Sequence, residues 1–263
     1  MKTIVCLLSV LSLLAFTSCA AMKSKSQTDT LSSSTLKWRV SQTVELPYLS
    51  YVPQDYDPKS GKTWPLMLFL HGAGERGTNV QRVAIHGPLS LVKKGTNFPF
   101  IILAPLCPEK KVWDNEKLLR LLDYSLQKFA VDPSRVYLTG LSMGGYGTWH
   151  LVVNHPERFA AAAPICGGDS LISLLLTKTY ETNRLTELKK VGIWAFHGAK
   201  DATVPPEESE RMINLLKKFG CEDVKLTIYP EATHNSWAET YKNPEFYEWL
   251  LRHERKPSAA SKR

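Results

Sequence analysis

The chain is poor in cysteine, and none of its cysteines has the spacing of a metal site. There are five in 263 residues, with no Cys-x-x-Cys pair and no Cys/His cluster, so we predict no metal. Cys107, Cys166 and Cys221 lie in the body of the chain. One disulfide can form among three cysteines, but the sequence does not define which pair would form it.

A dense stretch of lysine and arginine is also absent, although the formal net charge at pH 7 is +8. Lys2, the surplus single charge of residues 19–36 and three cations in residues 256–263 account for five of these charges. The rest of the chain is mildly basic, so we predict no nucleic-acid partner. No internal repeat is visible, and 43% hydrophobic residues is an ordinary globular value.

Long hydrophobic runs are missing except at the N-terminus, where residues 1–18 are typical of an export signal. The segment Phe16-Thr17-Ser18-Cys19 resembles a bacterial lipobox, with Phe16 where leucine is usual, and implies lipid attachment to Cys19. We therefore expect a cell-envelope lipoprotein, at the outer membrane or cell surface. The alternative is a periplasmic or secreted protein cleaved after Ser18, Ala20 or Ala21.

The Ser-, Thr- and Lys-rich composition of residues 19–36 predicts a flexible tether, and residues 256–263 are expected to form a disordered tail. Residues 37–255 between them alternate short apolar runs with helical patterns. Gly or Pro closes most runs, as is typical of strands buried on both faces of a parallel sheet. The predicted strands are 65–70, 100–104, 135–139, 159–165, 192–196 and 224–229.

Helices are predicted over 116–129, 146–153 and 206–219, with a last one opening at Asn243-Pro244. Alternating strands and helices indicate a single α/β domain, a doubly wound and mostly parallel sheet with helices on both faces. In that architecture ligands bind at the carboxyl ends of the strands, so residues that follow the predicted strands are the candidates for chemistry.

Gly140-Leu141-Ser142-Met143-Gly144 is a G-x-S-x-G pattern that directly follows one predicted strand and precedes a helix. A sharp strand-to-helix turn needs small residues around the serine and exposes its hydroxyl at the positive end of the helix. Ser142 is therefore the candidate nucleophile. The alternative is a glycine-rich turn whose serine only caps the helix.

A serine hydroxyl needs a base to take its proton and an acid to orient that base. We predict His234, which follows strand 224–229, as the base, and Asp201, which follows strand 192–196, as the acid. His197 is the rival base and Asp169 the rival acid. The other histidines, His86, His150 and His155, are expected to have surface or packing roles.

The oxyanion that forms on acyl transfer needs backbone N–H donors. Met143, next to the nucleophile, is one candidate. The loop 71–77 supplies the other, with Ala73 preferred over Gly74. This loop lacks the Gly-Lys-Ser/Thr sequence of a phosphate-binding P-loop.

These segments together resemble serine esterases of the α/β-hydrolase superfamily, most closely the bacterial phospholipase/carboxylesterase and feruloyl-esterase-like group, often exported as lipoproteins. The resemblance covers roughly Leu46 to Leu251, and it implies hydrolysis of carboxylic esters without a cofactor. It rests on 70–77, 140–145, Asp201 before Val204-Pro205, and Thr233-His234-Asn235-Ser236-Trp237. One departure is Asp169, where such sequences often continue the glycine run.

Aromatic residues near the predicted site could contact the substrate. Trp113 and Trp237 are the candidate pocket residues together with Gly74, whereas Trp149 is equally consistent with core packing. No long insertion separates the motifs, so we expect an open site without a large lid.

The resemblance implies short acyl, acetyl or feruloyl esters as substrates, either small molecules or esters on plant polysaccharide. Two alternatives have different consequences. One is an exported serine peptidase of the prolyl-oligopeptidase type. The other is a non-catalytic surface binding module.

Overall fold

The computed structural model describes residues 33–37, 39, 41 and 43–255. The predicted export signal, Cys19, much of the tether and the C-terminal tail lie outside the described residues. The folded unit begins at Val44, and the described residues before it form neither helix nor strand. Among the described residues, no helix is long and apolar enough to cross a bilayer.

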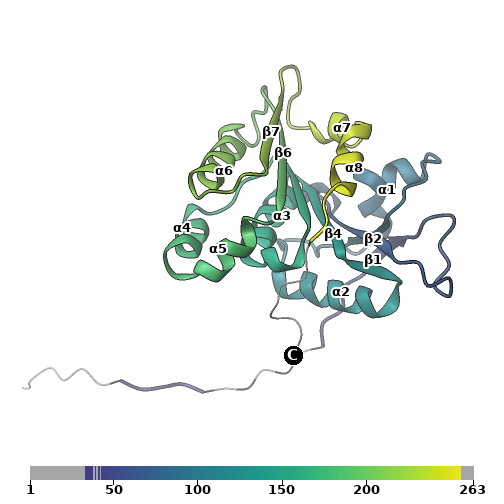
Figure 1. Cartoon of the computed structure of the whole chain (residues 1–263), viewed down its shortest axis with the longest axis horizontal. Helices are drawn as coiled ribbons and strands as arrows, with labels where there is room; N and C mark the ends of the chain where they lie inside the picture. Colours follow the sequence, from purple (N-terminus) through teal and green to yellow (C-terminus); the bar gives the residue numbers. More distant parts are fainter. Residues whose placement is uncertain (1–32, 38, 40, 42, 256–263) are drawn as a thin grey trace, which may run out of the picture. The chain divides into compact units, whose positions relative to one another are not determined.

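A seven-stranded sheet forms the centre of this unit (Figure 1), with the strand order β1-β3-β2-β4-β5-β6-β7. Neighbouring strands are parallel except β1, which pairs antiparallel with β3. The strands are β1 (Tyr48–Tyr51), β2 (Trp64–Leu70), β3 (Ile101–Pro105), β4 (Val131–Leu141), β5 (Ala161–Ile165), β6 (Gly192–Gly198) and β7 (Val224–Tyr229).

Eight α-helices connect or follow the strands in the described part of the chain. They are α1 (Gly87–Val92), α2 (Asn115–Lys128), α3 (Met143–Asn154), α4 (Leu171–Tyr180), α5 (Thr182–Leu188), α6 (Glu207–Lys218), α7 (Trp237–Thr240) and α8 (Pro244–Leu251). Short 3₁₀ helices cover Ala73–Glu75, Val80–Ala84 and Pro156–Arg158.

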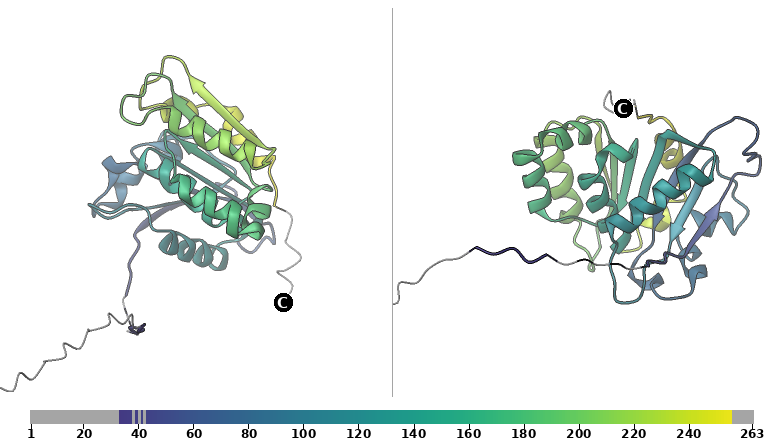
Figure 2. Two further views of the ribbon diagram at one scale, coloured as in Figure 1. Left: turned by 90° about the vertical axis from the view of Figure 1, so that its left-hand side faces the viewer. Right: turned by 90° about the horizontal axis from the view of Figure 1, so that it is seen from below.

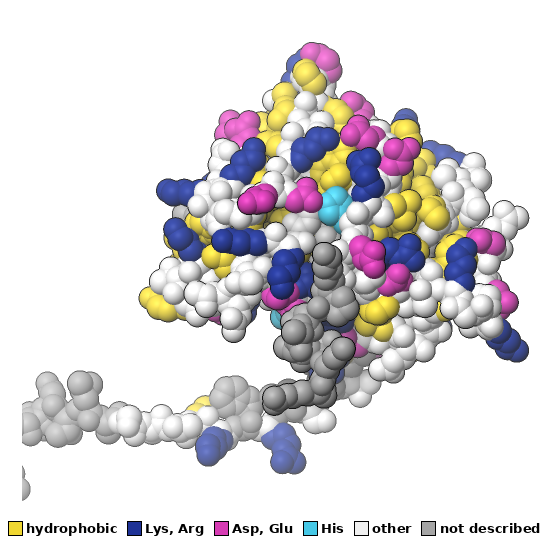
Figure 3. All heavy atoms as spheres, in the orientation of Figure 1, with side chains coloured by type: hydrophobic (Ala, Val, Ile, Leu, Met, Phe, Trp, Pro, Cys, Tyr) yellow, Lys and Arg dark blue, Asp and Glu magenta, His cyan; other side chains and the backbone are white. Residues whose placement is uncertain are grey.

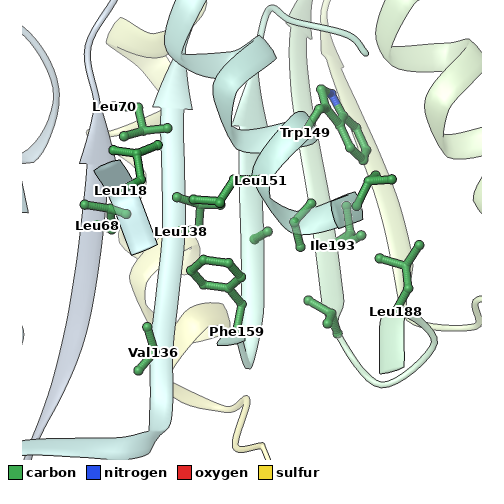
Figure 4. Close-up of a cluster of buried hydrophobic side chains, with 14 of the residues drawn as sticks. Leu68, Leu70, Leu118, Val136, Leu138, Trp149, Leu151, Phe159, Leu188 and Ile193 are labelled. Carbon is green, nitrogen blue, oxygen red and sulfur yellow. The ribbon is translucent and has the colours of Figure 1, made fainter. Parts of the chain in front are cut away.

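Helices cover both faces of the sheet, because alternate residues of a buried strand point to opposite sides. In β2, Leu66 and Leu68 pack in one core with α2, α3 and α6, whereas Met67 and Phe69 pack in a second core with α1 and α8. Figure 1 shows α6 on one side of β6 and β7, with α8 on the other, and Figure 2 gives two further views. Side chains from strands and helices interlock in the first core, including Leu68, Trp149 and Phe159 (Figure 4).

The surface of the folded unit carries charges of both signs. On the face that Figure 3 shows, lysine and arginine side chains lie among aspartates and glutamates, with hydrophobic side chains between them. Ion pairs of the folded unit include Arg211 with Glu208 and Lys190 with Glu187. This face therefore has the mixed charge expected for the body of the chain.

The predicted fold class is confirmed, and each of the six predicted strands is present with small shifts at its ends. The strand predicted over 135–139 is longer in the structure, because β4 continues back through Pro133 to Val131, where its register against β2 shifts. Strand β1 is not predicted, since its four residues are mostly half-buried and form no continuous apolar run. The short or weakly amphipathic helices α1, α4, α5 and α7 are not predicted either.

The three cysteines of the body of the chain form no disulfide. Cys107, Cys166 and Cys221 are all buried with free thiols. The disulfide that could form among these three cysteines in an exported protein is therefore absent. Burial raises the pKa of the Cys221 thiol to about 11, which keeps it protonated and poorly reactive at neutral pH.

Candidate active site

Ser142 lies in a strained turn between β4 and α3. Its backbone has φ 53° and ψ −117°, a positive-φ conformation that costs free energy in a non-glycine residue and is common at functional sites. Its N–H donates to the Ile165 carbonyl at 3.0 Å. A Cβ on Gly144 would lie only 2.0 Å from the Leu70 carbonyl oxygen, so α3 can approach β2 this closely only with glycine there.

The predicted acid, base and nucleophile meet in one hydrogen-bonded chain. His234 Nε2 lies 2.9 Å from Ser142 Oγ, and His234 Nδ1 lies 2.7 Å from Asp201 Oδ2. The histidine side chain is 23% exposed, while the aspartate side chain is fully buried. The three residues follow β4, β6 and β7, so the carboxyl edge of the sheet gathers them as expected.

Backbone amides hold Asp201 as an anion. The N–H groups of Thr203 and Val204 both donate to its Oδ1 at 2.9 Å. Burial alone would raise the pKa of this carboxyl, but hydrogen bonds from His234 and from these two amides lower it below its ordinary value. Asp201 therefore remains ionised and can orient His234 and stabilise it once protonated.

The rival base His197 supports the acid instead of contacting the serine. It is fully buried, with Nε2 2.9 Å from the Val204 carbonyl oxygen and 3.3 Å from Asp201 Oδ2. Its Nδ1 lies 2.8 Å from Ser209 Oγ. The imidazole thus links the Asp201 loop to α6.

The loop that was predicted to supply an oxyanion donor is held by a second buried histidine. His71 Nδ1 donates to the Gly72 carbonyl at 2.7 Å, and its Nε2 accepts the Cys107 N–H at 3.0 Å. This pattern requires the neutral ring, and burial lowers the pKa of His71 below its ordinary value. Trp113 Nε1–H donates to the His71 carbonyl at 3.2 Å, which ties the loop to the segment before α2.

Ala73 and Met143 each begin a helix. Ala73 is the first residue of the 3₁₀ helix Ala73–Glu75, and Met143 is the first residue of α3. The first N–H groups of a helix have no acceptor within it and point outward at its positive end. Both groups are therefore suited to bind an anion, and Met143 lies directly beside the nucleophile.

The candidate pocket residues occupy different positions. Trp237 packs its ring edge-to-face against His234 at 5.3 Å and also lies 5.6 Å from the ring of His86. Gly74 has open space where a Cβ would be, and its carbonyl oxygen accepts a hydrogen bond from Arg82. Trp149 is completely buried in the core, so it contacts no ligand.

A cavity of about 540 Å³ opens beside Met143. Its walls come from the segment before α2, from one side of α3 and from the segment after β5. The lining residues are Val112, Trp113, Met143, Tyr146, Gly147, His150 and Asp169. Trp113 is thus a pocket residue in the structure.

The rival acid Asp169 pairs with His150 at this cavity instead of with His234. His150 Nδ1 lies 3.2 Å from Asp169 Oδ1, and this hydrogen bond raises the pKa of His150 above its ordinary value. The sequence predicted only a surface or packing role for His150, so this pair was missed. The sequence signal that could have indicated His150 is its position seven residues after Met143, which is two helical turns along α3.

One cluster in the described part of the chain could resemble a metal site. Candidate ligand atoms of Cys166, Asp201 and His234 all lie within 4.8 Å of one another. Burial raises the pKa of the Cys166 thiol to about 12, whereas a metal would need the thiolate. The facing atoms of Asp201 and His234 are already hydrogen-bonded, so this donor set does not fit a metal ion.

A serine, an aspartate and a histidine in this chain order, at the carboxyl edge of a mostly parallel sheet, define the α/β-hydrolase class. The model of the phospholipase/carboxylesterase family matches residues 108–244, and the chain belongs to this family of esterases. The predicted resemblance is therefore confirmed.

Individual relatives agree with this class. A crystal structure described as a thermostable esterase shares 33% identity with a TM-score of 0.65, covering 81% of this chain and 60% of that one. A bifunctional acetylxylan esterase/xylanase of Neocallimastix patriciarum is 26% identical over 71% of this chain and 27% of its own length. An acylamino-acid-releasing enzyme of Arabidopsis thaliana is 25% identical over 46% of this chain. The chain spans only 20% of that enzyme and about a quarter of the acetylxylan esterase/xylanase.

Proposed function

We propose that the protein is a serine carboxylic-ester hydrolase that acts through an acyl-enzyme. The observation that carries this proposal is the unbroken chain of hydrogen bonds from Ser142 through His234 to Asp201. Each member is placed by a separate strand end. Membership of the phospholipase/carboxylesterase family supports the ester bond as the target.

The geometry of these residues supports the following reaction course. Ser142 Oγ attacks the ester carbonyl carbon while His234 Nε2 takes the hydroxyl proton, and Asp201 stabilises the imidazolium. The N–H groups of Ala73 and Met143 bind the oxyanion of the tetrahedral intermediate. His234 then returns the proton to the leaving alcohol oxygen. A water, deprotonated by His234, hydrolyses the acyl-Ser142 ester, and the proton passes back to Oγ.

The substrates that fit this proposal are short acyl, acetyl or feruloyl esters, free or attached to plant polysaccharide. The acetylxylan esterase/xylanase relative supports an ester on a polysaccharide. The cavity beside Met143 has room for an acyl group larger than acetyl. Export and a lipid anchor at Cys19, proposed from the N-terminal sequence, would place the enzyme at the cell surface, where polymeric substrates are accessible.

The test is hydrolysis of a panel of p-nitrophenyl esters and methyl ferulate by the wild type and by Ser142→Ala. We expect a burst of p-nitrophenol that matches the enzyme concentration if deacylation is slow, and loss of turnover in the variant. The matched control is Ser60→Ala, because Ser60 lies on an exposed turn before β2. Full esterase activity in Ser142→Ala would contradict the mechanism.

A second candidate is hydrolysis of acyl-amino acid amides, which the relatives named as acylamino-acid-releasing enzymes favour. The same serine, histidine and aspartate would serve, since only the leaving group differs. N-acetyl-alanine p-nitroanilide distinguishes the two activities. Cleavage of this amide faster than p-nitrophenyl acetate would favour the peptidase. If the folded wild type cleaves neither, a binding module becomes the better explanation.

A further inference from the structure

The cavity beside Met143 follows one side of α3. Met143, Tyr146, Gly147 and His150 line it, and these positions, i, i+3, i+4 and i+7, share one helical face. Seven residues separate Met143 from His150, so the cavity extends about 10 Å along the helix from the oxyanion donor. Met143, the residue that follows Ser142, lines its near end, and the titratable group of His150 lines its far end.

The position that the leaving oxygen must take determines which half of the ester enters this cavity. The leaving oxygen must face His234 Nε2 to receive its proton. His234 and its neighbour Trp237 do not line the cavity, whereas Met143 does. With the oxyanion between Ala73 and Met143, the alcohol faces His234 and the acyl group is directed into the cavity.

The two ends of the cavity differ in polarity. Val112, Trp113 and Tyr146 offer apolar and aromatic surface, which suits a flat acyl group. At the far end, His150 is about half exposed, at 48% of its side chain, while its partner Asp169 is only 7% exposed. A polar group at the distal end of the acyl chain would meet the imidazole.

The His150 ring is oriented so that its free nitrogen is available to a ligand. Its Nδ1 faces Asp169 Oδ1 at 3.2 Å, and the Ser170 N–H donates to the same oxygen at 2.7 Å. Asn154 Nδ2 lies 3.3 Å from the same His150 nitrogen and donates to the His150 carbonyl at 2.7 Å. No described residue forms a hydrogen bond with His150 Nε2.

Asp169 itself is held in place from α6. Arg211 donates to the Asp169 carbonyl oxygen at 2.8 Å and forms an ion pair with Glu208 at 2.6 Å. The backbone at Asp169 is therefore held before any substrate arrives, and the Ser170 N–H holds its carboxylate oxygen Oδ1. A fixed carboxylate on Nδ1 keeps a proton there, so the neutral ring presents an acceptor at Nε2.

We propose that His150, oriented by Asp169, is a specificity-determining residue that binds a hydroxyl at the distal end of a flat aromatic acyl group. A hydroxyl can donate to neutral Nε2 and can accept from its protonated form, so it matches the ring in both charge states. This inference rests on the proposed esterase function. The inference identifies His150 as the residue that selects among acyl chains. It also places this selection on the acyl side of the scissile bond.

The experiment compares methyl 4-hydroxycinnamate with methyl cinnamate, which differ only in the distal hydroxyl. We expect the wild type to prefer the hydroxylated ester in kcat/KM by about 2- to 13-fold, the size of one net hydrogen bond. His150→Ala should reduce this ratio to near one, and the effect should lie mainly in KM. His150→Gln, which retains an acceptor, should recover part of the preference, and Asp169→Asn should weaken it.

Two further variants serve as controls. His155→Ala removes a histidine that lies just after α3 and faces Glu157, outside the cavity, and it should retain the wild-type ratio. Tyr146→Phe removes the one side-chain hydroxyl among the residues that line the cavity, and it should retain the preference if His150 provides it. Each ratio compares two substrates of one variant, so a partial loss of folded protein cancels.

The outcomes separate this inference from the proposed function. Wild-type protein that hydrolyses p-nitrophenyl acetate but shows no preference between the two cinnamates would overturn the inference alone. Retention of the preference in His150→Ala, or its loss in Tyr146→Phe only, would do the same. Failure to hydrolyse any ester, acetate included, would instead overturn the proposed function.

Discussion

Two of the histidine–aspartate pairs in the described part of the chain, His234–Asp201 and His150–Asp169, share one half of their geometry. In both, Nδ1 faces a carboxylate oxygen, at 2.7 Å for His234–Asp201 and 3.2 Å for His150–Asp169. The other nitrogen of His234 lies 2.9 Å from Ser142 Oγ, whereas the other nitrogen of His150, a residue that lines the cavity, forms no hydrogen bond with a described residue. A histidine–aspartate pair therefore acquires its role from what lies at the second nitrogen.

The carboxylates of the two pairs are also held differently. Two backbone N–H groups bind the second oxygen of the fully buried Asp201, and the net effect lowers the pKa of that carboxyl. Asp169 shares one oxygen between His150 and a single backbone N–H. The first arrangement gives a firmly held anion beside His234, and the second gives a more exposed pair that suits ligand recognition better than proton transfer.

The largest effect is expected when the His234–Asp201 pair is broken and the His150–Asp169 pair is left intact. Asp201→Asn should reduce kcat for p-nitrophenyl acetate by roughly 10³- to 10⁴-fold, because an amide favours the wrong tautomer of the catalytic histidine. Asp169→Asn is the matched change, and its effect on acetate turnover should be far smaller. The two variants are compared in steady-state assays. Equal losses would show that the second pair is part of the proton relay.

The second-largest expected effect is a loss of stability when the turn that brings Ser142 to His234 is altered. Gly144→Ala would place a methyl group 2.0 Å from the Leu70 carbonyl oxygen, and we expect a loss of about 3 kcal/mol or more in the free energy of unfolding. Gly74→Ala is the control, since no heavy atom lies within 4 Å of the position that its Cβ would take. Urea denaturation followed by circular dichroism measures both.

Acid should destabilise the fold through His71, a buried histidine outside both pairs. Burial lowers the pKa of His71, so the unfolded chain takes up a proton at a higher pH than the native protein does. Stability should therefore fall as pH drops below about 6.5, by up to about 1.4 kcal/mol per pH unit from this residue.

Denaturation midpoints between pH 7 and pH 5 test this expectation. His71→Asn should be less stable at every pH, because Asn cannot accept the Cys107 N–H in the same way. It should nevertheless show a shallower decline with acid. An unchanged slope in the variant would assign the acid sensitivity to another group.

The smallest expected effect concerns the titration of His150 in the His150–Asp169 pair. The hydrogen bond to Asp169 raises the pKa of His150, so NMR should find it above 6.5 in the wild type and lower in Asp169→Asn. A raised histidine pKa contributes stability below the unfolded value of about 6.5, and this contribution is lost as pH rises through the folded value. Because the ring is half exposed, we expect only a few tenths of a kcal/mol.

Much of the fold was predictable because its signals are local. Continuous apolar runs closed by Gly or Pro predicted six strands, and the small residues around Ser142 predicted the turn. Strand β1 was missed because it is stabilised by antiparallel pairing with β3 across more than 50 residues of sequence, not by its own hydrophobic pattern. The short helices α4 and α5 depend on packing against α3 in the same way.

The sequence by itself determined the order of chemical groups and the strand ends at which they stand. Ser142, Asp201 and His234 could be chosen because each follows a recognisable strand. The tertiary structure alone decided the partners of the histidines. His234 contacts Asp201, 33 residues away in sequence, and Ser142, 92 residues away. His150 contacts Asp169, and His197 supports the loop that carries Asp201. Such pairings depend on strand order and on angles between loops, which arise only when the whole sheet has formed.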